Sequence, residues 1–575
     1  MPQPSYIQRL QLTMILSLSL LTLSAAFAQR LPSLLSADSI VVLGMQDMTG
    51  AGERSAAFQE EFNRLELATT LASLFGDDVS EDDLENALPE GVTWLDVLGT
   101  EAWLSVSASS FNPFPVITLA TVVSPSAADA LAPLLPDDDA DVLQEGDYTF
   151  YTLFLEDPDA PVQRIAYGLA DDVLFLSSNP DTLRASLRQL GGSDEASLLE
   201  TDGYNATLGT LAGGNFYGYV NYAGVAQAIK PFATGFGFDA LVERVSSMLG
   251  TLNTSAGVVR LLSDNVVSES VTSLNEAAGD TSLYNLLTID GYADTSTATR
   301  SPAGALSYST SFVDVAGWWD YLNELSSSVP ELGGSLNDLV LSFTGVDLST
   351  NLFGWMGTQV VSIVTGAGEV TEPGMMSDNL LGEFVYMIGT NDTQAASSGL
   401  AQVMQTISTT VAMFADPMGG SGDASSSTTD IAGVTVSTYA MAPGVTISTA
   451  VLDGYALISP SLESISTVLN AGSANLASLE AYQDAVSIIP GDASAVTYTD
   501  TSTNLRASAE QLASQLQVFA GLGGASTLDF DAIQTASDNL MTFFEFAAER
   551  LGPTVGYSQR SGADVYSYAE TPVSW

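Results

Sequence analysis

One local sequence pattern occurs twice in this chain, at widely separated positions. Residues 171–190 read DDVLFLSSNPDTLRASLRQL, and residues 453–472 read DGYALISPSLESISTVLNAG. Each copy begins with an acidic turn-like pair, continues through a short apolar run, and ends in apolar residues spaced for one face of a helix. A fold that contains the same structural unit twice explains this repeated pattern most simply, so the sequence predicts an internal duplication.

The pattern predicts a strand, a hairpin turn, a second strand and a capped helix. Asp171-Asp172 and Asp453-Gly454 are placed for tight turns, and D-G is a strong turn dipeptide. We expect Asn179 to cap the first helix, with Pro180 in its first turn, where a missing N–H costs nothing. In the second copy we expect Ser459 as the cap and Pro460 in the first turn.

Other segments of the two halves match in the same order. The matched ranges are 97–101 with 355–359, 115–123 with 384–389, 148–155 with 434–441, 165–169 with 445–450, 198–204 with 476–482, 238–240 with 530–532 and 249–250 with 551–552. Strands joined by tight turns form antiparallel sheet. The predicted fold class is therefore α+β, with two tandem, duplicated halves, each a mainly antiparallel sheet covered by helices.

Composition changes along the chain suggest where these halves begin and end. We expect a signal peptide at 1–28, a first α+β half at 29–276, a polar connection at 277–301 and a second α+β half at 302–575. The Ser/Thr-rich composition of 277–301 suggests the connection. The Gly/Ser-rich segment 417–427 is predicted as a loop or short linker.

The first 28 residues have the pattern of an export signal. Arg9 supplies the positive charge, residues 14–23 form an apolar core, and Ala26-Phe27-Ala28 is a cleavage signal that makes Gln29 the expected mature start. The apolar run is too short to span about 30 Å of hydrocarbon with margin. We expect an exported protein of the periplasm, cell envelope or extracellular medium, without a transmembrane segment in the mature chain.

Charge and missing residue types exclude several kinds of function. The chain has 68 acidic and 14 basic residues, and Lys230 is its only lysine. Such a surface repels phosphate backbones, so we expect no nucleic-acid partner. Cysteine and histidine are absent, which excludes disulfides, thiol nucleophiles, histidine triads and zinc sites with sulfur or imidazole ligands.

Four short motifs carry a family resemblance. ADSIVVLGMQD at 37–47 and LGTEAWLSVSA at 98–108 are followed by LFLSSNPDTL at 174–183 and SLLETDGY at 197–204. With the N-terminal signal, they resemble a bacterial exported family, domain of unknown function 3352. The resemblance covers most of the mature chain. Its motifs are structural, and it implies no activity.

The sequence offers few candidates for chemistry. No pair of carboxylates stands in a recognisable hydrolase motif, so we predict no catalytic residues and no cofactor. Asp137, Asp139 and Asp141 are weak calcium candidates, because Val142 stands where a calcium loop needs glycine. An acidic surface loop is the simpler interpretation of these residues.

An aromatic strand at 216–222 has two faces. Alternation places Tyr217 and Tyr219 with Asn221 on one face and Phe216 with Val220 on the other. An exposed tyrosine face could bind a sugar or a protein. Core packing is the competing interpretation.

These observations predict a non-enzymatic exported structural or binding protein of the bacterial cell envelope. The alternative is a carrier of an apolar ligand or lipid in a cavity between sheet and helices. A hydrolase that uses only carboxylates is a third possibility. The partner is unknown: a protein, a glycan or an apolar ligand.

Overall fold

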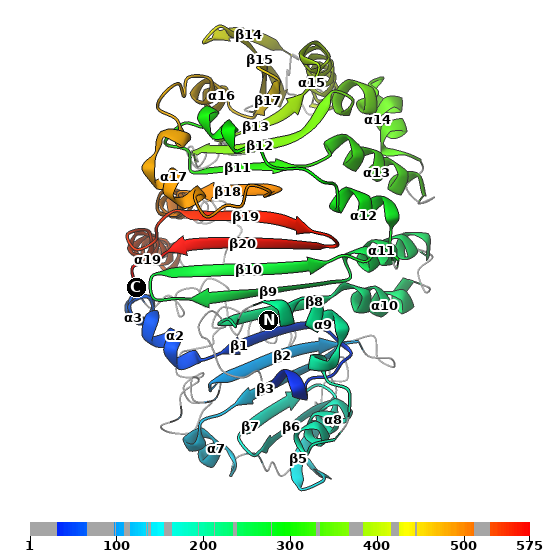
Figure 1. Ribbon diagram of the computed structural model, residues 1–575, viewed down its shortest axis with the longest axis vertical. Coiled ribbons are helices and arrows are strands. Elements are labelled where there is room, and N and C mark those ends of the chain that lie inside the picture. The colour runs from blue at the N-terminus through cyan, green and yellow to red at the C-terminus, as the bar shows by residue number, and fades with distance from the viewer. Residues whose placement is uncertain are drawn as a thin grey trace.

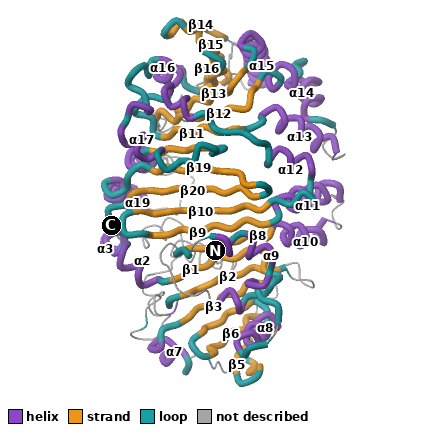
Figure 2. The backbone as a smooth tube through the Cα atoms, in the orientation of Figure 1, coloured by secondary structure: helices purple, strands orange, loops and turns teal. Residues whose placement is uncertain are grey.

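The computed structural model describes 31–65, 92, 97, 99–108, 115–133, 135, 140–154, 164–193, 195–211, 213–233, 239–277, 279–328, 334–366, 383–415, 425–442, 445–510 and 530–575. The strands of these ranges form one antiparallel sheet of twenty strands (Figures 1 and 2). Helices lie mainly at the two ends of the strands and over parts of the faces.

Ten strands come from each half of the chain. The first ten are β1 (Ser39–Gln46), β2 (Glu101–Ser107), β3 (Val116–Val122), β4 (Asp141–Glu145), β5 (Tyr148–Phe154), β6 (Arg164–Ala170), β7 (Val173–Ser177), β8 (Phe216–Asn221), β9 (Thr254–Leu261) and β10 (Asn265–Ser273). The second ten are β11 (Ser307–Phe312), β12 (Met356–Gly366), β13 (Glu383–Thr390), β14 (Ser426–Ile431), β15 (Val434–Ala442), β16 (Val445–Leu452), β17 (Tyr455–Ser459), β18 (Ala495–Thr499), β19 (Thr554–Ser561) and β20 (Asp564–Pro572).

Both sets of ten strands are connected in the same order. The first set lies in the order β4-β5-β6-β7-β3-β2-β1-β8-β9-β10. The second lies in the order β14-β15-β16-β17-β13-β12-β11-β18-β19-β20. Antiparallel pairing of β10 with β20 joins the sets into one sheet. The predicted antiparallel α+β class is confirmed, and the halves share a single sheet.

The helices are named by their order along the chain. Before residue 280 they are α2 (Met48–Arg54), α3 (Ala56–Arg64), α7 (Pro125–Leu131), α8 (Pro180–Leu190), α9 (Asp202–Ala206), α10 (Tyr222–Ala233) and α11 (Asp239–Leu252). After it they are α12 (Thr281–Leu287), α13 (Val315–Ser328), α14 (Leu336–Thr344), α15 (Thr393–Ala415), α16 (Leu462–Leu469), α17 (Glu480–Val486) and α19 (Phe530–Ala548). Short helical turns are η1 (Leu31–Leu34), η2 (Leu198–Glu200), η3 (Leu208–Thr210), η4 (Thr295–Arg300), η6 (Ser349–Phe353) and η8 (Leu476–Ser478).

One face of the sheet carries the main core of each half, and we call it the core face. In the first half, buried Val42 and Phe175 of the sheet pack with Leu183 of α8 and Tyr204 of α9. In the second half, Tyr308, Tyr498 and Leu457 pack with Ile465 of α16 and Tyr482 of α17. On the opposite face, α15 packs on β15, β16 and β17. Helices therefore cover different parts of both faces.

Gly44 of β1 makes room for a large aromatic side chain in this core. A Cβ atom at Gly44 would clash with the ring of Trp103 on the neighbouring strand β2. Trp103 is buried and stacks on Tyr217 of β8, with 5.4 Å between ring centroids. The absence of a side chain at position 44 thus lets this aromatic pair lie against the sheet.

The repeated pattern builds the predicted hairpins and helices. Asp171 and Asp453 both adopt positive φ, at 54° and 46°, in the turns that join β6 to β7 and β16 to β17. Asn179 caps α8 by accepting a hydrogen bond from the N–H of Asp181 at 2.8 Å, and Pro180 begins the helix. These predictions are confirmed.

The predicted cap of the second copy is wrong. α16 begins at Leu462, and its cap is Ser461, whose Oγ accepts from the N–H of Ser464 at 3.1 Å. Ser459 is the last residue of β17, and its Oγ accepts from the N–H of Ser461. Pro460 therefore precedes the cap, because β17 continues to Ser459 and the helix begins two residues later than the proline suggested.

The structure contains regular elements in parts of two segments, 417–427 and 277–301, that were predicted as a loop and a polar connection. Ser426 and Ser427, predicted to end a loop, begin strand β14; β-propensity of the following threonines and pairing with β15 override the linker-like composition. Residues 416–424 lie outside the described residues. Within 277–301, predicted as the connection between halves, α12 and η4 are formed.

Candidate functional site

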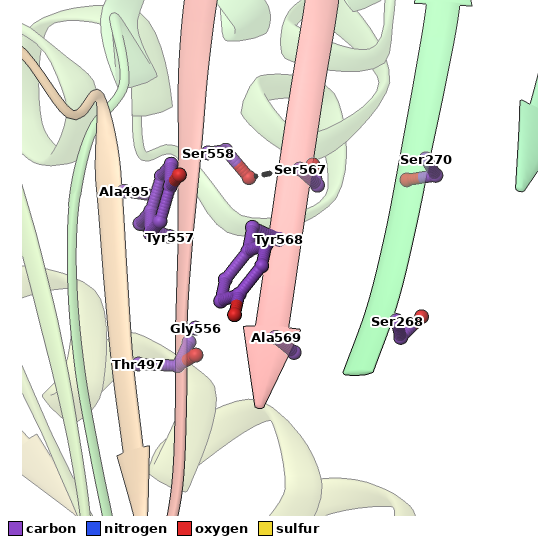
Figure 3. Close-up of a pocket in the computed structure, with 10 residues that line it drawn as sticks. All are labelled: Ser268, Ser270, Ala495, Thr497, Gly556, Tyr557, Ser558, Ser567, Tyr568 and Ala569. Carbon is purple, nitrogen blue, oxygen red and sulfur yellow. Dashed lines mark hydrogen bonds between the residues drawn. The ribbon is translucent and has the colours of Figure 1, made fainter. Parts of the chain in front are cut away.

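The junction of the two halves contains a pocket of about 230 Å³ on the face opposite the core face. Its lining is formed by Ser268, Ser270, Ala495, Thr497, Gly556, Tyr557, Ser558, Ser567, Tyr568 and Ala569 (Figure 3). Eight of these residues are small, and strand alternation directs their side chains to this face; Tyr557 and Tyr568 lie between them in β19 and β20, with their side chains on the core face. The register of β10, β20, β19 and β18 aligns the eight small residues in two rows of four across the four strands.

The pocket floor is neutral and rich in hydroxyl groups. Ser558 and Ser567 share a hydrogen bond of 2.8 Å across β19 and β20, which Figure 3 shows. The volume lies below the range of about 300–1,000 Å³ that is usual for ligand pockets. The pocket therefore fits a small polar group or ordered water better than an acyl chain.

On the core face of the same strands, tyrosines and carboxylates join the two halves. Tyr566 of β20 donates a hydrogen bond of 2.5 Å to Oε1 of Glu269 on β10, and Arg260 of β9 forms an ion pair with Glu269. Tyr568 donates to Oε2 of Glu570 at 2.6 Å, and Glu570 also accepts a hydrogen bond from Asn265. We call these six residues, together with Tyr557, the seam cluster.

The chemistry of the seam cluster is that of a structural hydrogen-bond network. Burial raises the pKa of Tyr566 above its usual range, and the hydrogen bond to Glu269 raises it further. Burial and the hydrogen bond to Glu570 likewise raise the pKa of Tyr568. Both phenols therefore remain protonated donors at neutral pH. The ring of Tyr557 stacks on that of Tyr568, 5.3 Å away between centroids.

A row of helices forms a second candidate surface at one end of the strands (Figure 1). From α10 to α15, each helix contacts the next along the row. The six helices carry only two basic and five acidic residues in a chain of net charge −54. Several large apolar side chains on them are exposed: Leu241, Leu322, Leu339, Leu341, Phe343 and Ile407.

Phe343 is the most exposed of these apolar residues. It is 77% exposed and lies one helical turn from Leu339, which is 48% exposed, on α14. None of the residues of α14 is buried. Exposed apolar groups that gather on one surface commonly mark an interaction site. We call these six exposed residues together the apolar helix row.

The sequence candidates for metal binding are not brought together. Asp137 and Asp139 lie outside the described residues, and Asp141 is the exposed first residue of β4. Among the residues that the structure describes, no three Asp or Glu side chains come close enough to hold a metal ion. The calcium hypothesis therefore gains no support from Asp141.

Core packing is confirmed for the aromatic strand at 216–222, and an exposed tyrosine face is excluded. Tyr217 and Tyr219 are 5% and 2% exposed, and they pack against Trp103 and Tyr204. The alternation was predicted correctly, but segments distant in sequence cover the tyrosine side. Asn221 is the last residue of β8 and Tyr222 begins α10.

The expected cleavage site, Ala28 and Gln29, also lies outside the described residues. The described chain begins with Leu31, which is fully buried. Its N–H donates a hydrogen bond of 3.0 Å to Oε1 of buried Glu101, which also accepts from Trp103 Nε1 at 2.9 Å.

Sequence reasoning missed the seam cluster and the apolar helix row. The alternation of Tyr566, Tyr568 and Glu570 could have placed these side chains on one face of a strand. Nothing local indicated that Glu269, almost 300 residues earlier, would lie beside them.

The helices of the described residues were also compared with the requirements for a membrane span. None of these described helices combines the length and the apolar character that a transmembrane helix needs.

Comparisons with known proteins add a family match. A family model described as "Protein of unknown function (DUF3352)" matches residues 109–535. No curated protein matches the chain. Two solved structures, crystal forms III and I of TP0453, are similar at 11% and 10% identity, with TM-scores of 0.23 and 0.21. They cover 46% of this chain and 87% and 85% of theirs, and likenesses this weak carry no argument.

Proposed function

The chain belongs to the DUF3352 family of unknown function, as the sequence resemblance indicated, and we propose that it is a non-enzymatic structural or binding protein exported to the bacterial cell envelope. The observation that carries this proposal is the continuous sheet. Nine residues of β10 pair with nine of β20, so backbone hydrogen bonding runs through the junction of the halves. Twenty strands spaced by about 4.8 Å give a contour of about 90 Å across the sheet.

The seam cluster supports a structural role. Its carboxylates are engaged with Arg260, Tyr566, Tyr568 and Asn265, and three of these four contacts join neighbouring strands. A catalytic carboxylate must instead be free to exchange a proton or attack a substrate. The pocket on the other face of these strands offers hydroxyl groups for a small polar contact.

Export is supported by the signal-like sequence of residues 1–28. Cleavage after Ala28 would retain Leu31, which is buried and donates its N–H to Glu101. N-terminal sequencing of the chain after expression in a Gram-negative host tests this, with Gln29 as the expected first residue. Recovery of the full-length chain in the cytosol would contradict it.

We further infer that the halves arose by internal duplication, which explains why one fold presents the same strand order twice. Equivalent positions share roles. Glu101 of β2 accepts the N–H of Leu31, and Gln359 of β12 accepts the N–H of Asp294 at 3.0 Å. Replacing Glu101 by Gln, the residue at the equivalent site, tests the equivalence. We expect Glu101→Gln to fold with a loss below about 2 kcal/mol, and Glu101→Leu to lose clearly more.

A carrier of an apolar ligand is the second candidate function, and the apolar helix row favours it. Its exposed residues could contact an acyl chain or a lipid-like molecule. Native mass spectrometry of the purified chain tests this candidate. Co-purified lipid that is lost in Phe343→Ser would support the carrier, whereas ligand-free protein after expression in a lipid-rich host would contradict it.

A further inference from the structure

The two outer strands of the sheet, β4 and β14, occupy equivalent positions at opposite ends of the molecule. Among the described strands each pairs on one side only, β4 with β5 and β14 with β15. Figure 1 shows β14 at the extreme end of the long axis. A free edge is a template for pairing with another strand unless charges, proline or a bulge protect it. The protection of each edge therefore decides whether it can accept another strand.

The edge of β14 presents unused backbone groups. Ala432 and Gly433 form its two-residue turn, with φ of 53° and 81°, so Ile431 and Val434 flank the turn as a hydrogen-bonded pair. Alternation along the strand then directs the N–H and C=O groups of Ser426, Thr428 and Asp430 outward. Within the described chain, no hydrogen bond reaches these outward groups.

The two edges are protected differently. β4 carries Asp141 and Glu145 at its two ends and directs only Val142 and Gln144 outward. β14 has the sequence SSTTDI, with one charge and no lysine or proline, and five of its six residues are exposed. β14 is therefore the edge that is open to another strand.

We propose that β14 pairs antiparallel with β14 of a second copy of this chain, about a two-fold axis at Thr428. In this register Thr428 faces the partner's Thr428, and Ser426 faces the partner's Asp430. Each of the three outward residues can exchange two backbone hydrogen bonds, which gives six in all. No like charges lie opposite each other, and Thr–Thr pairs favour strand pairing.

Other pairings of the edges are less favourable. A two-fold pairing of β4 with itself has only Val142 and Gln144 directed outward, so it makes four backbone hydrogen bonds instead of six. It also places Asp141 opposite the partner's Glu145 twice, a like-charge contact that the ion pairs of Glu145 with Arg184 and Arg188 reduce in part. Pairing of β4 with β14 uses the two outward residues of β4 and so makes four hydrogen bonds. It is also open-ended, whereas the two-fold pairing closes at a dimer.

End-to-end pairing also suits the charge of the molecule. Two bodies of net charge −54 repel, and contact through β14 at one end keeps most of their acidic residues far apart. Salt screens the remaining repulsion. A contact of six residues a side buries far less than the roughly 1,200–2,000 Å² of a stable interface, so association is weak and depends on concentration.

Sedimentation velocity of the purified chain, over the widest soluble concentration range and at low and high salt, tests the proposal. We expect a monomer–dimer equilibrium that strengthens with salt. Thr428→Pro removes one outward N–H per copy and should raise the dissociation constant about tenfold or more. Val142→Pro makes the same change on the equivalent edge β4 and should leave the dimer unchanged.

A second variant guards against misfolding by proline. Thr428→Glu adds a charge to an exposed side chain and places two glutamates opposite each other at the two-fold axis, near Asp430 of both copies, so it should also weaken the dimer. A monomer at every concentration and salt would overturn the proposal. Equal weakening by Val142→Pro would overturn it in favour of β4–β14 pairing. An unchanged dissociation constant in both Thr428 variants would also overturn the proposal, because the contact would then lie elsewhere.

Discussion

Tyr566 donates a hydrogen bond of 2.5 Å to Glu269, and this contact links two strands through residues that lie 297 positions apart in the sequence. β10 and β20 would each be an edge strand if the halves were separate. Their pairing makes one sheet, and the seam cluster adds side-chain contacts along the junction. The stability of the junction should therefore depend on these side chains as well as on the backbone.

Tyr566→Phe removes the hydrogen bond across the seam and keeps the ring. Glu269 then retains Arg260 as its partner, so we expect a loss of about 1–2 kcal/mol in the free energy of unfolding, measured with denaturant. The matched control is Tyr557→Phe, because no hydrogen bond of the Tyr557 hydroxyl is formed within the described chain. The control should lose less than about 0.5 kcal/mol. Equal losses in both variants would contradict the role of the bond.

Stability should decrease at alkaline pH. Burial and the carboxylate bonds raise the pKa of Tyr566 and of Tyr568, so the folded chain keeps protons that the unfolded chain releases near pH 10. The folded state then binds more protons above about pH 10, and the free energy of unfolding falls as pH rises through this range. Unfolding curves measured between about pH 8 and pH 11.5 should fall less steeply in a Tyr566→Phe, Tyr568→Phe variant. The same slope in both proteins would refute the assignment.

Gly44→Ala should disturb the core because its Cβ would meet the ring of Trp103. Overpacking of this kind costs about 1–3 kcal/mol. Gly218 lies on the adjacent strand β8 opposite Leu43, and a Cβ atom there would meet no other atom within 4 Å, so Gly218→Ala is the control. We expect the control to be neutral or slightly stabilising. Tryptophan fluorescence and thermal unfolding measure both changes, and equal behaviour of the two variants would contradict the packing.

Phe343→Ser should reduce the binding of a hydrophobic dye without changing stability. The side chain is 77% exposed, so its loss should alter the free energy of unfolding by less than about 0.5 kcal/mol. Tyr292, 63% exposed and outside the apolar helix row, gives the control Tyr292→Ser. Dye fluorescence should fall only for the Phe343 variant. Similar falls in both would show that no special surface exists at α14.

Local features of the fold were predictable from the sequence. The turns at Asp171 and Asp453 and the cap at Asn179 depend on residues within a few positions of one another. The cap at Ser461 was missed because Pro460 resembled a first-turn proline, although the helix begins two residues later than expected. Local rules therefore locate an element better than they locate its ends.

Long-range features were not predictable in the same way. The alternation of Tyr217 and Tyr219 gives their common face, but helical segments elsewhere decide that this face is buried. The pairing of β10 with β20 and the contact of Glu269 with Tyr566 depend on how the halves meet, which no local pattern encodes. The Ser/Thr composition of β14 is typical of a linker until pairing with β15 organises it.

Amide hydrogen exchange at β10 and β20 tests the central claim, a sheet that is continuous through the junction, most directly. If the sheet is continuous, the amides of 265–273 and 564–571 should be as strongly protected as those of the neighbouring strands β9 and β19. Tyr566→Phe should lower this protection, and Val142→Pro at the distant edge β4 should not. Fast exchange of the β10 and β20 amides that face each other across the junction, with β9 and β19 protected, would show two separate sheets. That result would contradict the account.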